Sequence, residues 1–192
     1  MTTLIQGVRR LLVLTALMTA GSASSVSANP ATGPAPTVHA ADGVYTVTAE
    51  FSVSEPATIA IAALTDYENI PRFMPAVRAS TVLERTAAHT VIEQEALARF
   101  MMFSRRIHLV LEVREHAGTI RFRDRCGQSF GQYEGAWTIS ERGGRTSITY
   151  QLSARPAFDV PGFLLKRLLK RDAQQMIERL KIEIAARART VG

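Results

Sequence analysis

The chain has 192 residues, which is enough for one hydrophobic core of ordinary size and too short for a second full domain beside it. Hydrophobic residues make up 46% of the chain and charged residues 21%, fractions that are typical of a folded globular domain and that exclude a disordered chain. The formal net charge is +6, but the sequence contains no nucleic-acid recognition motif, so we expect no nucleic-acid partner.

The first 28 residues have the order of a secretory signal peptide. Arg9 and Arg10 precede an apolar run at residues 11–20, and Val26-Ser27-Ala28 follows the A-x-A-like pattern of a cleavage site. The run is too short to cross a bilayer core, which needs about 20 apolar residues. We therefore expect cleavage near Ala28 and a protein that is periplasmic or secreted.

The next residues predict where the folded domain begins. Residues 29–42 are rich in Pro, Ala and Thr and lack apolar periodicity, so we predict a flexible linker there and a folded domain at 43–190. Apolar and polar residues alternate over 45–53, which predicts a half-buried strand. Two short helical segments follow, at about 57–64 and 67–74.

The rest of the chain predicts a sheet and one long helix. Alternation predicts strands at 77–85, 89–98, 104–115, 119–125, 133–141 and 145–154. Short turns join them, so we expect an antiparallel sheet. Apolar residues then recur every three or four positions over 161–188, as in an amphipathic helix. The single apolar stripe must cover one sheet face, which predicts an α+β fold with a curved antiparallel sheet wrapped around a long C-terminal helix.

Several motifs together resemble one family. The segment LTDYENIPRFMP at 64–75, followed by VLE at 82–84, resembles the start of bacterial polyketide cyclase/dehydrase-like proteins. Gly135-Ala136-Trp137 resembles their late-strand G-x-W signature. The resemblance covers 43–188 and points to the START-like (SRPBCC) superfamily, which includes the coenzyme Q-binding START proteins. It implies a helix-grip fold with an internal cavity for a lipid, quinone or polyketide-like molecule.

The resemblance leaves three functions open. The leading hypothesis is carriage or sequestration of a hydrophobic small molecule, without a cofactor. A polyketide cyclase/dehydrase-like enzyme is the second, and it needs a polar pair inside the cavity, for which Glu93, Glu95 or Glu134 with Tyr150 are the candidates. The competing interpretation places these carboxylates on the outer sheet face beside abundant arginines. The third function is an envelope protein-interaction module with a collapsed cavity.

Apolar and aromatic residues are the candidates for ligand binding. A filled core is the competing interpretation, because core and pocket residues look alike in sequence. Trp137 and Tyr150 carry polar tips that could orient a ligand. The candidate ligand-binding residues are Phe73, Met74, Phe103, Phe122, Trp137, Tyr150, Leu165, Leu169 and Met176. No histidine spacing typical of a metal site occurs, so no metal is expected.

One segment departs from a plain core pattern. Phe100-Met101-Met102-Phe103 is apolar at a predicted hairpin tip, where polar residues are usual. We hypothesise that the tip touches a membrane or shields the mouth of the cavity. In the membrane contact, Phe100, Met101 and Met102 enter the lipid while Arg105 and Arg106 meet lipid phosphates. The alternative is that the tip folds over its own core. A basic stretch on the last helix, from Lys166 to Arg171, could add attraction to anionic lipid, or it could be an ordinary solvated face.

Overall fold

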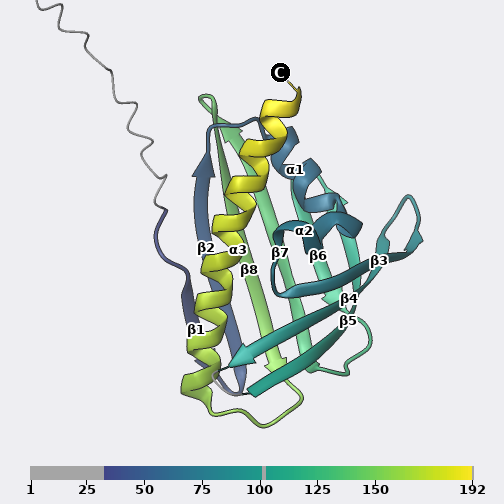
Figure 1. Cartoon of the computed structure of the whole chain (residues 1–192), viewed down its shortest axis with the longest axis vertical. Coiled ribbons are helices and arrows are strands. Elements are labelled where there is room, and N and C mark those ends of the chain that lie inside the picture. The colour runs from purple at the N-terminus through teal and green to yellow at the C-terminus, as the bar shows by residue number, and fades with distance from the viewer. Residues whose placement is uncertain (1–32, 101–102, 192) are drawn as a thin grey trace, which may run out of the picture. The chain divides into compact units, whose positions relative to one another are not determined.

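The computed structural model describes residues 33–100 and 103–191 (Figure 1). The predicted signal peptide at residues 1–28 lies outside the described residues, as do Met101 and Met102. The side chains of Phe100 and Phe103 also lie outside the description.

Eight antiparallel strands form one curved sheet in the order β1-β2-β8-β7-β6-β5-β4-β3. The strands are β1 (Thr37–Ala41), β2 (Val44–Val53), β3 (Val77–Arg85), β4 (Thr90–Phe100), β5 (Phe103–His116), β6 (Thr119–Asp124), β7 (Phe130–Arg142) and β8 (Arg145–Pro156). Consecutive strands from β3 to β8 pair through hairpins, and β2 pairs with β8. This order brings the first hairpin beside the last strand.

The helices lie on one face of this sheet, which we call the inner face (Figure 1). They are α1 (Ala57–Thr65), the short 3-10 helix η1 (Tyr67–Asn69), α2 (Ile70–Phe73) and the long α3 (Gly162–Val191). The α+β helix-grip prediction is confirmed, and the expected long helix at 161–188 corresponds to α3. None of the described helices has both the length and the apolar character needed to span a bilayer.

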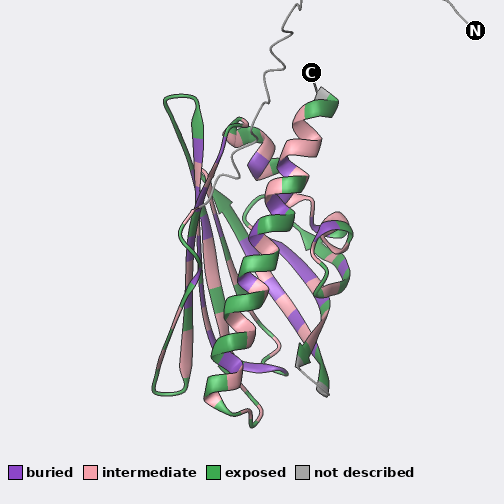
Figure 2. Cartoon of the chain, turned by 60° about the vertical axis from the view of Figure 1, so that its left-hand side comes forward, coloured by how far each residue is buried: buried purple, intermediate pink, exposed green. Residues whose placement is uncertain are grey.

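Alternation along the strands builds the core on the inner face. The register places Phe51 of β2 opposite Ile148 of β8, which in turn lies opposite Ile139 of β7, and all three are buried. Successive strand residues point to opposite faces, so the residues between them reach solvent. On α3, Ile177 and Ile184 are buried against this face, and Figure 2 shows the buried stripe along the helix.

The linker prediction is wrong for residues 37–41, which form β1 and pair with β2. Asp42 and Gly43 make the turn between the two strands, with φ angles of 50° and 75°. This Asp-Gly pair is a hairpin signal that the Pro-, Ala- and Thr-rich composition obscures. The chain already packs on β2 before β1 begins, because a Cβ on Gly33 would lie 2.5 Å from the Glu50 carbonyl oxygen.

Candidate ligand-binding interior

A row of aromatic rings follows the inner face of the sheet toward the end where α3 begins. Neighbouring ring centroids are 4.4 Å apart for Trp137–Tyr150, 6.5 Å for Tyr150–Phe122, 6.0 Å for Phe122–Tyr133, 4.9 Å for Tyr133–Phe130 and 6.2 Å for Phe130–Phe158. We call these six residues the aromatic row. Such spacings lie in the range in which aromatic pairs attract one another.

Glycine at position 135 makes room for the row. Gly135 lies opposite Phe122 in the neighbouring strand, and a Cβ there would lie 2.6 Å from the Cζ atom of the Phe122 ring. The same Cβ would also collide with the Gln151 carbonyl oxygen. The Gly-Ala-Trp motif therefore has two linked structural roles, since Gly135 admits one ring of the row and Trp137 supplies another.

The structure brings most of the predicted ligand-binding residues together. Phe73, Trp137 and Tyr150 belong to one buried cluster, and four more pack against it at partial burial: Met74, Phe122, Leu169 and Met176. Leu165 is also buried. The side chain of Phe103 lies outside the description.

Three members of the aromatic row escape the sequence prediction. Tyr133 shares its strand face with Trp137, so the alternation pattern contains a signal for it. Phe130 begins β7 and lies before the strand predicted at 133–141, so no alternation assigns its direction. Phe158 lies in the loop before α3, and a loop has no periodicity from which to predict the direction of a side chain.

Polar groups of the row lack hydrogen-bond partners within the described part of the chain. These groups are the hydroxyls of Tyr133 and Tyr150 and the indole N–H of Trp137. Yet no fully buried side-chain nitrogen or oxygen among the described residues is without a partner. Each of these three polar atoms must therefore still touch space that a water molecule can enter, although Tyr150 is only 6% exposed and Trp137 only 7%.

Both tyrosines remain hydrogen-bond donors at neutral pH. Burial, with a smaller contribution from the negative charge of Asp124, raises the pKa of Tyr133 to about 12. Burial also raises the pKa of Tyr150 well above its ordinary value of 10.0, with a further contribution from Tyr133. The interior thus offers apolar ring faces together with two O–H donors and one N–H donor. This combination suits a largely apolar molecule that carries an oxygen acceptor.

The three candidate carboxylates do not join Tyr150 in the interior. Glu134 lies between Tyr133 and Gly135 on β7, so it points to the outer sheet face, where it accepts a hydrogen bond from Gln132 at 2.9 Å. Glu93 and Glu95 likewise alternate with the buried Ile92 and Gln94. A Glu93 oxygen lies 3.7 Å from Nε2 of His108 on the same outer face. The pair that the enzyme hypothesis needs is not formed.

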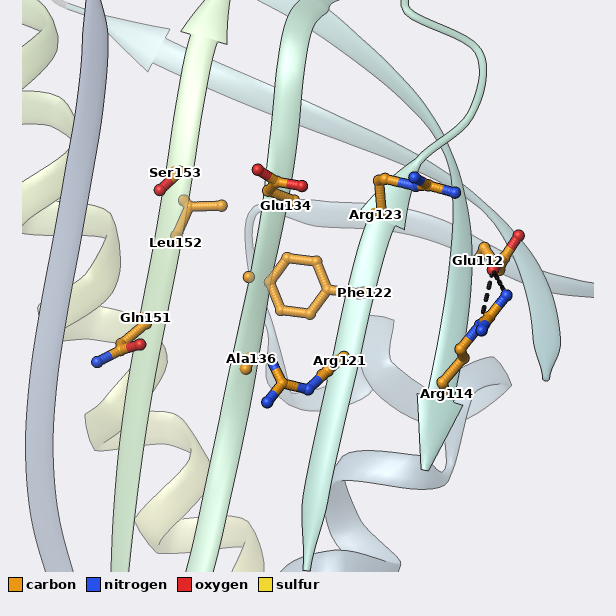
Figure 3. Close-up of a pocket in the computed structure, with 11 residues that line it drawn as sticks. Glu112, Arg114, Arg121, Phe122, Arg123, Glu134, Ala136, Gln151, Leu152 and Ser153 are labelled. Carbon is orange, nitrogen blue, oxygen red and sulfur yellow. Dashed lines mark hydrogen bonds and ion pairs between the residues drawn. The ribbon is translucent and has the colours of Figure 1, made fainter. Parts of the chain in front are cut away.

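Glu134 instead lines a depression of about 500 Å³ on the outer face of β5 to β8 (Figure 3). Charged and polar side chains surround it, among them Glu112, Arg114, Arg121 and Gln151. The hydrogen bond from Arg114 to Glu112, 2.9 Å long, is the main reason why the pKa of Glu112 is lowered. Phe122, Ala136 and Leu152 also line the depression, so its lining mixes charged side chains with apolar ones.

The residues predicted to touch a membrane are only partly described. Arg105 and Arg106 are exposed. The guanidinium carbon of Arg105 lies 4.0 Å from the centroid of the Phe158 ring, a cation–π contact at the last ring of the aromatic row. Phe100 and Phe103 end β4 and begin β5.

Comparison with known proteins identifies the family. Residues 56–181 match the family model described as polyketide cyclase/dehydrase and lipid transport. The chain belongs to this family. This match confirms the resemblance seen in the sequence. Members of the family share a START-like fold that binds hydrophobic ligands. No curated protein matches the sequence.

Solved structures support the same fold. A START superfamily protein from Mycobacterium smegmatis matches with a TM-score of 0.62 and 18% identity, over 77% of this chain and 99% of that one. A protein from Thermus thermophilus matches at 0.64 and 20%, over 74% and 99% of the two chains. The Zhui aromatase/cyclase from Streptomyces sp. R1128 matches at 0.60 and 14%, over 76% and 94%. At these identities the likeness establishes the fold alone.

Proposed function

We propose that this protein binds a hydrophobic small molecule that carries at least one oxygen acceptor, and that it carries or sequesters that molecule. The ligand would lie along the aromatic row, on the side that α3 covers, with its oxygen against Tyr133 or Tyr150. Lipids, quinones and polyketide-like molecules all fit this description. The observation that carries the proposal is the pair of unpartnered tyrosine hydroxyls within an apolar interior.

Physical chemistry favours such an occupant. The tyrosine hydroxyls can be reached by water, so exchanging that water for a ligand acceptor contributes about 0.5 to 1.5 kcal/mol. Each methylene moved out of water contributes about 0.8 kcal/mol, so ten of them contribute about 8 kcal/mol before the cost of ordering the ligand. A dissociation constant of about 1 μM needs a net free energy of about 8 kcal/mol, so a ligand longer than ten methylenes, or one that also forms the hydrogen bond, is needed to offset the cost of ordering. The interior can therefore hold a lipophilic molecule with useful affinity and no covalent chemistry.

The function would be carried out outside the cytoplasm. The predicted signal peptide would direct the processed protein to the periplasm or the medium, where a lipophilic molecule needs a carrier to cross water. Cyclase or dehydratase activity is not part of the proposal, because Glu93, Glu95 and Glu134 all point away from the interior.

Fluorescence of Trp137 tests the proposal, since it is the sole tryptophan of the chain and lies within the row. Decylubiquinone and bromostearic acid both quench indole emission and represent a quinone and an acyl chain. We expect saturable quenching by at least one of them. Quenching by both that only matches collisional quenching of free tryptophan would contradict the proposal.

A further inference from the structure

The beginning of α3 carries an exposed aromatic side chain beside three cations. Phe163, in the first turn, is 73% exposed and is the most exposed large hydrophobic residue of the described chain. Lys166, Arg167 and Lys170 follow at spacings of three, four and seven residues, so all four share one side of the helix. The three cations are themselves exposed. We call these four residues the α3 basic face.

Among the described residues, none covers the α3 basic face. Its four residues line a groove of about 540 Å³, whose other wall is the segment 35–38 at the start of β1. None of the three cations is paired with an acid of the described residues. Arg171, the next cation, is used differently: it donates to the Arg99 carbonyl oxygen at 2.9 Å and to Asp172 at 3.1 Å.

Two contacts place the α3 basic face near Phe158, the last ring of the aromatic row. The bond from Arg171 to Arg99 joins α3 to the end of β4, and the contact of Arg105 with Phe158 joins the start of β5 to the loop before α3. Figure 1 shows the start of α3, the end of β4 and the start of β5 gathered at one end. A surface bound at the α3 basic face would therefore lie near the last ring of the row.

We propose that the α3 basic face docks the protein on an anionic phospholipid surface. Phe163 enters the boundary between headgroups and acyl chains, and the three cations contact lipid phosphates. Peripheral lipid-binding helices combine Lys and Arg with exposed Trp, Phe or Leu. In α3 the single residue Phe163 supplies the exposed apolar part, because the apolar stripe of the helix packs on the sheet. A bilayer also satisfies both halves of the pattern at once, because it offers apolar depth and negative charge in one plane.

Vesicle co-sedimentation of the processed protein, which contains every described element, tests the proposal. We expect binding to vesicles of phosphatidylcholine mixed with phosphatidylglycerol, little binding to phosphatidylcholine alone, and weakening with added salt. Combining Lys166→Glu, Arg167→Glu and Lys170→Glu should weaken binding at least a hundredfold, since each cation near an anionic surface accounts for about a fivefold change. Phe163→Ser should weaken it several-fold.

Matched control variants distinguish a specific role of the α3 basic face from the general effect of removing exposed charge or exposed apolar surface. Arg121→Glu, Arg142→Glu and Arg145→Glu change the same number of exposed cations on the sheet, and Ile182→Ser removes another exposed apolar residue of α3. Binding should be much closer to wild type in these controls, with circular dichroism verifying the fold of every variant. Equal loss in the control and test variants, or no wild-type binding to phosphatidylglycerol vesicles, would overturn the proposal. In the second case an acidic protein would be the better candidate partner.

Discussion

The indole of Trp137 lies against the ring of Tyr150, with 4.4 Å between the ring centroids and 37° between the ring planes. The two residues are directly opposite each other in β7 and β8, so strand register fixes the contact. The contact places the sole tryptophan of the chain beside a hydroxyl that has no partner among the described residues. Trp137 is consequently a reporter built into the proposed binding site.

Tyr150→Phe should separate ligand binding from stability. The hydroxyl makes no hydrogen bond within the described residues, so its removal should change the free energy of unfolding by less than about 1 kcal/mol. A hydrogen bond to a ligand oxygen would be lost, which should weaken binding about three- to tenfold. Trp137 quenching by the better of the two probes measures the affinity, and urea unfolding measures the stability. Unchanged affinity would remove Tyr150 from the ligand contact.

Gly135→Ala should destabilise the sheet. The new Cβ would collide with the Gln151 carbonyl oxygen and with the ring of Phe122, and the carbonyl belongs to the paired backbone of β8. We expect a loss of about 3 kcal/mol in urea unfolding. Gly131→Ala is the matched control on the same strand, because its Cβ would meet its nearest atom only at 4.0 Å. Equal effects at the two positions would show that the collisions at position 135 are not the cause.

Sequence periodicity predicts most of the strands and the long helix, but it predicts only part of the candidate ligand-binding site. Alternation places β2 within one residue of its observed bounds, and the three-to-four spacing locates α3. The sequence does not distinguish ligand contacts from core, because both use Phe, Leu and Met. Nor does it reveal that Phe158, in a loop, completes the aromatic row, since a loop has no period from which to read direction.

Arg187→Ala should weaken the attachment of α3 to α1. Arg187 forms a 2.7 Å ion pair with Asp66 and donates to the Ala62 carbonyl oxygen at 3.1 Å. Both partners of the ion pair are partly exposed, so we expect a loss of about 1 to 2 kcal/mol at neutral pH. The exposed Arg189→Ala is the control. If Arg189→Ala were as damaging, the ion pair would not be the cause.

The same ion pair should affect how steeply the free energy of unfolding falls as the pH becomes acidic. Burial raises the pKa of Asp66, but the hydrogen bonds from Asn69 and Arg187 and the charge of Arg187 outweigh burial and lower the pKa below its ordinary 3.8. A carboxyl whose pKa is lowered by folding stabilises the fold above the unfolded pKa, and this stabilisation is lost as pH falls through the folded value. Urea unfolding measured from neutral to acid pH should therefore show a shallower acid limb in Arg187→Ala.

Asp172→Asn, unlike Arg187→Ala, should stabilise the fold at neutral pH. Burial raises the pKa of Asp172, and the hydrogen bond from Arg171 offsets this only in part. A carboxyl whose pKa is raised by folding binds its proton more tightly in the folded state, so stability falls as pH rises from the ordinary 3.8 through the raised value. The amide removes that loss and should raise the melting temperature at neutral pH. Asp159→Asn, exposed in the loop before α3, is the control.

Export is tested by the N-terminus of the processed protein. Cleavage near Ala28 removes Arg9 and Arg10 and no acid, so the net charge should fall from +6 to +4. Intact mass and N-terminal sequencing of protein recovered from the periplasm or medium should place the first residue near Asn29. Recovery of the full-length chain from the cytoplasm alone would contradict export.

Native mass spectrometry of the protein, purified without added lipid from the cells that produce it naturally, is the most direct test of ligand binding in the interior. We expect a bound species heavier than the bare chain, which organic extraction releases as a lipid, a quinone or another lipophilic molecule bearing an oxygen. That species should be depleted in Tyr150→Phe. A bare-chain mass only, together with failure of the protein to take up any component of a total envelope lipid extract, would contradict the claim that the interior is a ligand site.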